Sequence, residues 1–155
     1  MDYLAAAEAF GTLRQCSQNF IVEACQKLHL TYTEYALLIS LFEMEGASQD
    51  ELTEKMGLDK SAVTRTVKSL ESKGFVFRQQ DILDKRKKHL YLTQAAKDKR
   101  KFLEQVIKSW VSYLTAGLSA SQEEILLQGF QQLAARAQQA DFRQLCRLAE
   151  SGDKS

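Results

Sequence analysis

Four side chains of residues 60–73 have the types and the spacing of a surface that binds nucleic-acid bases and phosphates. They are Ser61, Arg65, Lys68 and Ser72, and the intervals between them are four, three and four residues. A helix would carry them on one face. The arginine could bind O6 and N7 of a guanine through two hydrogen bonds, and Ser61 and the neighbouring Thr64 could adapt to several bases. An ordinary solvated helix can show the same pattern, so the flanking residues have to decide.

The elements that would position this face can be read from the same region. Val63, Val67 and Leu70 form an apolar stripe at helical spacing, which can pack on a core while the polar face meets solvent. The predicted elements, in order, are a helix over 49–56, a turn at Gly57-Leu58, a helix over 60–73, and strands over 75–80 and 88–92 joined by the basic loop Asp81–Lys87. This order is that of a winged helix-turn-helix, which places one helix in a major groove and a loop in the adjacent minor groove.

Charge is concentrated in this part of the chain. The 155 residues contain 21 Lys and Arg against 20 Asp and Glu, a net charge of +1. Residues 55–101 hold 14 of the basic and 5 of the acidic residues, which leaves 7 against 15 elsewhere. A local excess of positive charge is what a surface for a polyanion needs, and the acidic remainder would keep the other surfaces off DNA.

Helix starts outside this region are marked by capping residues and apolar periodicity. The expected N-cap residues are Thr31, Ser48, Asp59, Thr93 and Ser119. Three of them have Glu or Gln three residues later and so predict capping boxes. The further predicted helices span 3–29, 32–45, 94–116 and 120–149, and Glu150–Ser155 is expected to be a frayed tail. The predicted fold class is therefore mainly α with a small β-hairpin wing.

The outer helices carry more apolar surface than the winged region can cover. The residues expected to form a dimer interface are Phe10, Leu13, Phe20, Ile125, Phe130, Leu133, Leu145 and Leu148. Pairing with a second copy would bury them, and a twofold dimer would place two 60–73 helices about one duplex turn apart. Packing within one chain, as a compact bundle, is the alternative.

Several sequence segments resemble the MarR family of bacterial transcriptional regulators. They are Leu52-Thr-Glu-Lys-Met-Gly57, Ser61-Ala-Val-Thr-Arg65, Leu70-Glu-Ser-Lys-Gly-Phe75, and Asp84-Lys-Arg86 with Leu92-Thr93. The resemblance covers nearly the whole chain. It implies one MarR-like chain over 1–155, with a winged helix-turn-helix DNA-binding region at 31–93 and dimerisation helices at 1–29 and 94–150. Ala96 departs from the family pattern, which often has glycine there, and alanine is the better helix former.

The resemblance implies a sequence-specific regulator, expected to be a repressor, that binds palindromic double-stranded DNA as a homodimer. Three cysteines without short paired spacing suit a reducing compartment, so a cytoplasmic location is expected. Arg86 would enter the minor groove, oriented by Asp84, while the lysines beside it meet phosphates. The residues expected to contact DNA or support that contact are Ser48, Lys60, Ser61, Ala62, Thr64, Arg65, Lys68, Asp84, Lys85, Arg86, Lys87 and Lys88.

Other function classes find little support in the residues. His29 and His89 lack a Ser or Cys partner in a nucleophile motif, and no glycine-rich phosphate loop is present, so no catalytic residue is predicted. Cys25 and His29 share a helix face but are too few for a structural zinc site, and no metal is expected. No apolar run is long enough to span a membrane, and no secretion signal is evident. A winged helix used for protein contacts without DNA remains an alternative.

The signal that such a regulator senses is the least defined part. No cofactor is expected, but the resemblance implies release from DNA by a small aromatic or phenolic effector. Residues Leu30–Tyr35 resemble the organic-peroxide-sensing branch, whose reactive cysteine lies near the start of the first helix, where this chain has Glu8-Ala-Phe10. Cys16 and Cys25 are therefore interpreted as buried structural thiols. A redox-responsive regulator that uses Cys16 or Cys25 is the alternative.

Overall fold

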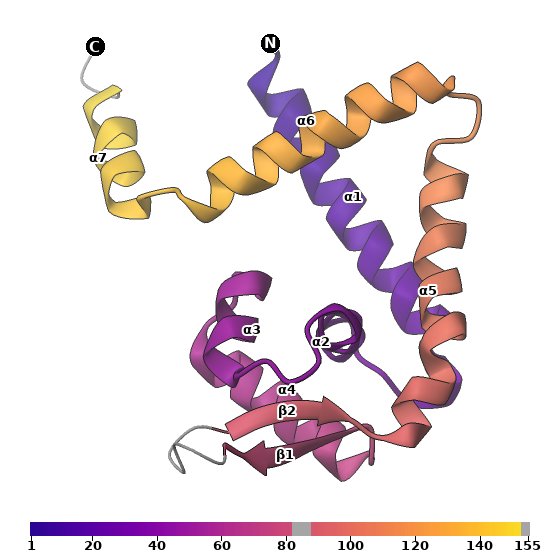
Figure 1. Cartoon of the computed structure of the whole chain (residues 1–155). Helices are drawn as coiled ribbons and strands as arrows, with labels where there is room; N and C mark the ends of the chain where they lie inside the picture. Colours follow the sequence, from indigo (N-terminus) through magenta and orange to yellow (C-terminus); the bar gives the residue numbers. More distant parts are fainter. Residues whose placement is uncertain (82–87, 153–155) are drawn as a thin grey trace. The chain divides into compact units, whose positions relative to one another are not determined.

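The chain is mainly helical with one two-stranded antiparallel hairpin, as the sequence predicts. The computed structural model describes residues 1–81 and 88–152 (Figure 1). The elements are α1 (Tyr3–Ala24), the 3-10 helix η1 (Gln26–Leu28), α2 (Tyr32–Glu43), α3 (Gln49–Met56), α4 (Lys60–Ser72), β1 (Val76–Gln80), β2 (Lys88–Leu92), α5 (Gln94–Leu114), α6 (Ala120–Gln138) and α7 (Phe142–Gly152). They divide into two compact units, Met1–Leu114 and Thr115–Ser155.

The first unit contains the winged helix-turn-helix. Helices α2, α3 and α4 pack on one another, and the hairpin packs against α4 and α2. In the hairpin, Val76 pairs with Leu92 and Gln80 with Lys88. A short segment before α3 adds to it, because the Leu90 amide donates to the Ala47 carbonyl and the Gly46 amide to the Leu90 carbonyl, both at 2.9 Å.

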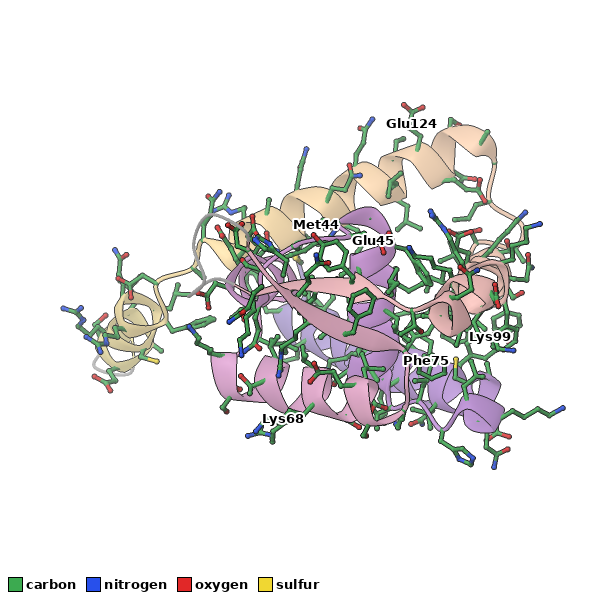
Figure 2. The ribbon with its side chains drawn as sticks, turned by 60° about the horizontal axis from the view of Figure 1, so that its bottom comes forward. Met44, Glu45, Lys68, Phe75, Lys99 and Glu124 are labelled. Atoms are coloured by element: carbon green, nitrogen blue, oxygen red, sulfur yellow. The ribbon has the colours of Figure 1, made fainter. Side chains whose placement is uncertain are left out.

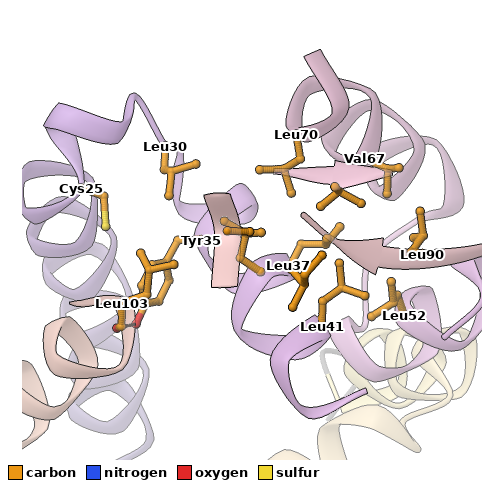
Figure 3. Close-up of a cluster of buried hydrophobic side chains, with 14 of the residues drawn as sticks. Cys25, Leu30, Tyr35, Leu37, Leu41, Leu52, Val67, Leu70, Leu90 and Leu103 are labelled. Carbon is orange, nitrogen blue, oxygen red and sulfur yellow. Dashed lines mark hydrogen bonds between the residues drawn. The ribbon is translucent and has the colours of Figure 1, made fainter. Parts of the chain in front are cut away.

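One core joins these elements. Leu37 and Leu41 of α2, Leu52 of α3, and Val67 and Leu70 of α4 are each fully buried (Figure 3). Leu90 and Leu92 cover this cluster from the hairpin. Burying a side chain of this size contributes about 1.5–3 kcal/mol, so the core fixes how α4 lies on the unit.

Helices α1 and α5 continue the same core away from the hairpin. The Tyr35 hydroxyl donates to the Leu103 carbonyl of α5 at 2.9 Å, and burial raises the pKa of Tyr35 to about 12. Phe20 of α1 stacks on Trp110 of α5, with ring centroids 5.1 Å apart. The Trp110 Nε1 donates to the Ser17 hydroxyl at 2.8 Å. Helix α5 is thus tied both to α2 and to α1.

The predicted helix starts are confirmed. Capping boxes with both reciprocal hydrogen bonds begin α2, α3 and α6 at Thr31, Ser48 and Ser119. Asp59 caps α4 by accepting from the Ala62 amide at 2.8 Å. The Thr93 hydroxyl accepts from the Ala96 amide at 3.3 Å at the start of α5. These local hydrogen bonds satisfy amides that the helices leave unpaired, which is why sequence alone locates them.

Two predicted helix boundaries are wrong. The expected helix over 3–29 ends at Ala24 and continues as η1, and His29 then takes a left-handed conformation with φ of 52°. The expected helix over 120–149 is two helices, because the chain breaks after Gln138 and α7 begins anew. Asp141 caps this second start, accepting from the amides of Arg143 and Gln144 at 2.9 and 3.1 Å.

The second unit consists of α6 and α7, and both expose apolar side chains. Residues that are half or more exposed include Ile125, Leu133, Leu145 and Leu148, which were predicted to form the dimer interface, and also Leu127 and Phe142. Phe130 is 44% exposed. Helix α7 reaches Gly152 and so includes the first three residues of the expected tail. Across 1–81 and 88–152, no helix is long and apolar enough to cross a membrane.

Candidate nucleic-acid interface

Helix α4 has the two faces that the sequence predicts. Val63 and Val67 are fully buried, whereas Ser61, Arg65 and Lys68 are exposed. Lys68 projects from α4 into solvent (Figure 2). Since the buried face is fixed by the core, the guanidinium and the ammonium are held on an outward surface. Ala62 and Thr64 are half-buried at the edge of this face.

The turn before α4 sets where this helix begins. Gly57 ends α3 in the left-handed region, with φ of 62°, where a side chain would be strained. Asp59 then caps α4, and its carboxylate also accepts from the Ser61 hydroxyl at 2.5 Å. The hydrogen bond from Ser61 is the main cause that lowers the pKa of Asp59. The carboxylate at the N-terminus of α4 is therefore ionised at neutral pH, which the helix dipole favours.

The hydroxyl groups on the exposed face are engaged within the protein. The Ser61 oxygen accepts from Nη1 of Arg65 at 3.2 Å while its hydrogen goes to Asp59. The Thr64 hydroxyl donates to the Lys60 carbonyl at 2.7 Å and accepts from Nε2 of Gln49 at 2.5 Å. The second of these bonds ties α3 to α4. Sequence reasoning did not identify Gln49, whose partner lies 15 residues away.

Ion pairs separate the basic residues of this region into two groups. Lys60 pairs with Asp50 at 2.7 Å and Arg78 with Glu71 at 3.1 Å. Within the described ranges, Arg65 and Lys68 form no ion pair with a carboxylate. Their charge is therefore available to an external anion, and phosphate attraction is the sequence-independent part of DNA binding.

A buried carboxylate holds the C-terminal end of α4. Both oxygens of Glu34, 3% exposed, lie 2.7 Å from Nζ of Lys73, and the Ser69 hydroxyl donates to one of them at 2.5 Å. The same Lys73 ammonium also donates to the His29 carbonyl at 2.6 Å. Burial raises the pKa of Glu34, but the hydrogen bonds from Lys73, Ser69 and Thr31 outweigh it and the net pKa is lowered. Glu34 is thus a charged anchor for α4.

The base of the wing is held by His89. Its Nδ1 lies 2.7 Å from the Gly46 carbonyl and its Nε2 3.0 Å from a carboxylate oxygen of Asp81. His89 also forms an isolated bridge with Ser48, the half-buried cap of α3. Lys88, the first residue of β2, is exposed. The expected wing residues Asp84, Lys85, Arg86 and Lys87 lie outside the described residues.

Comparison with known proteins places this geometry in a family. Residues 30–88, which cover α2 to the start of β2, match the model of the MarR family. The chain belongs to the MarR family. It is 30% identical over 105 residues to an uncharacterized HTH-type transcriptional regulator, YdgJ, of Bacillus subtilis (68% of this chain). It is 37% identical over 89 residues to the HTH-type transcriptional regulator TtmR of Methylorubrum extorquens (57% of this chain). The matches span 63% and 42% of those relatives, less than two thirds of either.

Solved structures of the family share the fold. A putative MarR family transcriptional regulator from Listeria monocytogenes, complexed with 26mer DNA, superposes with a TM-score of 0.82 at 16% identity. The superposition covers 86% of this chain and 89% of the other. The predicted winged helix-turn-helix is thereby confirmed.

The cysteines of this MarR-family chain differ from one another in burial. Cys25 is fully buried, as predicted, and burial raises its pKa. Cys16 and Cys146 are exposed, so the interpretation of Cys16 as a buried thiol is wrong. The contacts of α1 with Trp110 of α5 are made by Ser17 and Phe20, and Cys16 is left exposed beside them. In the described part of the chain, no three His, Cys, Asp or Glu side chains lie together as a metal site would require.

The predicted dimerisation residues are divided between the two units and differ in exposure. Phe20 and the half-buried Leu13 belong to the first unit, and Phe20 stacks within it on Trp110. Phe10 is 52% exposed on the same helix. The five residues from α6 and α7 are exposed in the second unit. The periodicity that marked Phe20 as an interface residue could not separate a partner helix of the same chain from one of a second copy.

Proposed function

We propose that this protein is a DNA-binding transcriptional regulator that acts in the cytoplasm as a repressor. The proposal rests on α4, which buries its apolar face and presents Arg65 and Lys68 outward, with no carboxylate partner among residues 1–81 and 88–152. An exposed helix of this kind at the second position of a helix-turn-helix suits a major groove. The activity is binding, with no catalytic step. The names of the relatives, and the DNA in the Listeria structure, support the same proposal.

The proposed binding unit is a homodimer on a palindromic operator. Apolar residues on α1, α6 and α7, such as Phe10, Leu133 and Leu148, are each half or more exposed. A second copy would bury them, and twofold symmetry would set two α4 helices against two half-sites. The basic wing residues 85–88 would contact phosphates, with Arg86 in the minor groove.

The test is binding to the promoter next to the gene, followed by substitution of Arg65. The wild-type protein should shift this DNA and protect a symmetric site. Arg65→Ala should cost about 1–3 kcal/mol on that site and relax the preference at one base pair per half-site, as loss of a two-bonded guanine contact does. An equal loss on the operator and on random DNA would make Arg65 a phosphate contact. A wild-type protein that does not bind the promoter would contradict the proposal.

Release by a small aromatic or phenolic effector is part of the proposal. A cavity of about 280 Å³ in the first unit is lined by Gln18, Tyr32, Thr33, Ala36, Ser40, Met56 and Leu58. None of these side chains is charged, whereas hydroxyl and amide groups are present, so a neutral phenol fits this lining better than a carboxylic acid. Titration of the protein–DNA complex with a phenol and with salicylate distinguishes the two. Release by the phenol at lower concentration is expected.

A further inference from the structure

We propose that Ser61 and Asp59 position Arg65 and do not themselves contact bases. This inference rests on the DNA binding proposed above, and it changes the role that the sequence suggests for Ser61. The evidence for it is a chain of hydrogen bonds over the first turn and a half of α4, which runs from Asp59 through Ser61 to Arg65.

Ser61 has no donor left for a base. A serine hydroxyl has one hydrogen, and here it is donated to Oδ1 of Asp59 at 2.5 Å. The same oxygen accepts from Nη1 of Arg65 at 3.2 Å. Donating to a carboxylate makes the hydroxyl oxygen a better acceptor, because hydrogen bonds in a chain polarise one another. The negative charge of Asp59 therefore acts on Arg65 through Ser61 as well as across space.

Arg65 keeps enough donors for a base while it is held. A guanidinium has five N–H groups, and the bond to Ser61 uses one of those on Nη1. The remaining donors can still reach O6 and N7 of a guanine. Ordering a long, flexible side chain before binding lowers the entropy lost on binding, an effect of about 2- to 10-fold in affinity for one such side chain.

The other hydroxyl on this edge agrees with this division of roles. Thr64 donates its hydrogen to the Lys60 carbonyl and accepts from Gln49. Its hydroxyl therefore joins α3 to α4 and has no hydrogen to offer a base. Base contacts from α4 would then depend on Arg65 and Lys68.

A double-mutant cycle on the operator tests the proposal. Ser61→Ala, Arg65→Ala and the double variant are measured on the operator and on a version changed at the base pair that Arg65→Ala relaxes. Ser61→Ala should weaken operator binding by about 2- to 10-fold and reduce the preference at that base pair. In the Arg65→Ala background it should change nothing further. Additive losses would show that Ser61 contacts DNA independently and would overturn the proposal.

A matched control comes from Ser109 on α5. It accepts from Nε2 of Gln105, one turn away, at 3.2 Å and is exposed like Ser61. Ser109→Ala should leave operator affinity and base preference unchanged. Asp59→Asn keeps an N-cap side chain and an acceptor for Ser61 but removes the charge. It should lower the same base preference by less than Ser61→Ala, and an unchanged preference would exclude Asp59 from the chain of contacts.

A measurement without DNA separates this inference from the proposed function. Nitrogen-15 relaxation of the Arg65 guanidinium in the free protein should show an ordered group in the wild type. Ser61→Ala should increase its motion, and Ser109→Ala should not. If the group is ordered through Ser61 but the promoter is not bound, the proposed function fails and the contact stands. If Arg65 is equally mobile in wild type and Ser61→Ala, the positioning role is wrong whatever the protein binds.

Discussion

Single residues in this protein often serve two elements at once, and Glu34 is the main example. Its carboxylate completes the capping box of α2 through the Thr31 amide, at 2.7 Å. It also holds Lys73 and Ser69 at the C-terminal end of α4. A buried charge is costly unless it is paired and hydrogen-bonded, and here it is both. The start of α2 and the end of α4 are therefore coupled through one side chain.

Glu34→Gln should destabilise the protein in a pH-dependent way. Glutamine keeps a capping acceptor but loses the charge that Lys73 needs, so unfolding free energy should fall by about 1–3 kcal/mol at neutral pH. Because the pKa of Glu34 is lowered in the folded state, its stabilisation is present above the ordinary glutamate pKa. It is lost as the pH falls from about 4.3 through the lower folded value.

Chemical denaturation of both proteins across that pH range measures this effect. The two denaturation midpoints should converge in acid as Glu34 of the wild type is protonated. Glu124→Gln serves as the matched control, since Glu124 is exposed on α6, and it should differ from wild type by less than about 0.5 kcal/mol. A Glu34→Gln difference that persists unchanged in acid would assign the loss to packing.

Cys25 and Cys146 should differ in reactivity. Burial raises the pKa of the Cys25 thiol, so at neutral pH it is protonated and covered. Iodoacetamide should therefore modify Cys146 in the native protein and reach Cys25 only after unfolding. Mass spectrometry of peptides after a short pulse checks this. Equal labelling of Cys25 and Cys146 in the native state would support a redox role for Cys25.

At the scale of elements, the hairpin is fixed at its base by His89 and by its bonds to the segment before α3. The strands on either side of residues 82–87 are therefore held in place, and β1 packs against α4. The sequence of these residues contains Asp84 and Arg86 among lysines. An arginine in a narrow minor groove responds to negative potential, which is strongest in A/T-rich DNA.

Arg86→Ala should therefore weaken binding most on operators with A/T-rich flanks. The slope of log affinity against log salt should fall by about one unit per half-site. Asp84→Ala should act in the same direction but less, because a carboxylate can orient the arginine and cannot attract DNA. Titrations at two salt concentrations give the sign, with Lys108→Ala on α5 as a charge-matched control. Tighter binding by Asp84→Ala would mean that the loop is a set of solvated charges.

The break between α6 and α7 is also decided at this scale. Asp141 accepts two amides and starts a new helix, so the apolar residues before and after it do not lie on one continuous face. The pattern across 120–149 remained compatible with one helix because Gln139 and Ala140 do not interrupt helices by themselves. A cap within a long apolar pattern is the signal that marks this boundary.

At the scale of the whole molecule, the exposed apolar surface of α6 is the reason for the proposed homodimer. Leu133 is 50% exposed and Ile125 69% exposed on α6. Burying the part of each side chain that is still exposed would contribute about 1–2 kcal/mol, since full burial of a fully exposed side chain contributes about 1.5–3 kcal/mol. Patches of this kind mark interaction surfaces in monomeric chains.

Leu133→Glu should weaken dimerisation and, with it, operator binding. The charge would be buried in the proposed interface, so the dimer should dissociate at concentrations where the wild type stays intact. Gln131→Glu is the control, since it adds the same charge two residues earlier, on the opposite side of α6. Sedimentation velocity over a range of concentrations measures both. A Leu133→Glu dimer as stable as the wild type would place the interface elsewhere.

What the sequence by itself determined is local. Hydroxyl and carboxylate caps at Thr31, Ser48, Asp59 and Ser119 mark helix starts, because their hydrogen bonds span three residues. The helical spacing of Val63 and Val67 predicted the buried face of α4, with Arg65 on the opposite face. This pattern is also local, because it depends only on residues within one or two turns of the helix. The order of elements then indicated the winged fold.

What only the tertiary structure decided is the identity of partners that are far apart along the chain. Lys73 contributes to the basic excess of residues 55–101, but its charge neutralises Glu34, 39 residues away. Phe20 looks like an interface residue, but it stacks on Trp110 of the same chain. The sequence pattern shows that an apolar face must be covered or that a charge must be paired. It does not show which group covers the face or pairs with the charge. That depends on how the whole core packs, because the hydrophobic effect is non-directional.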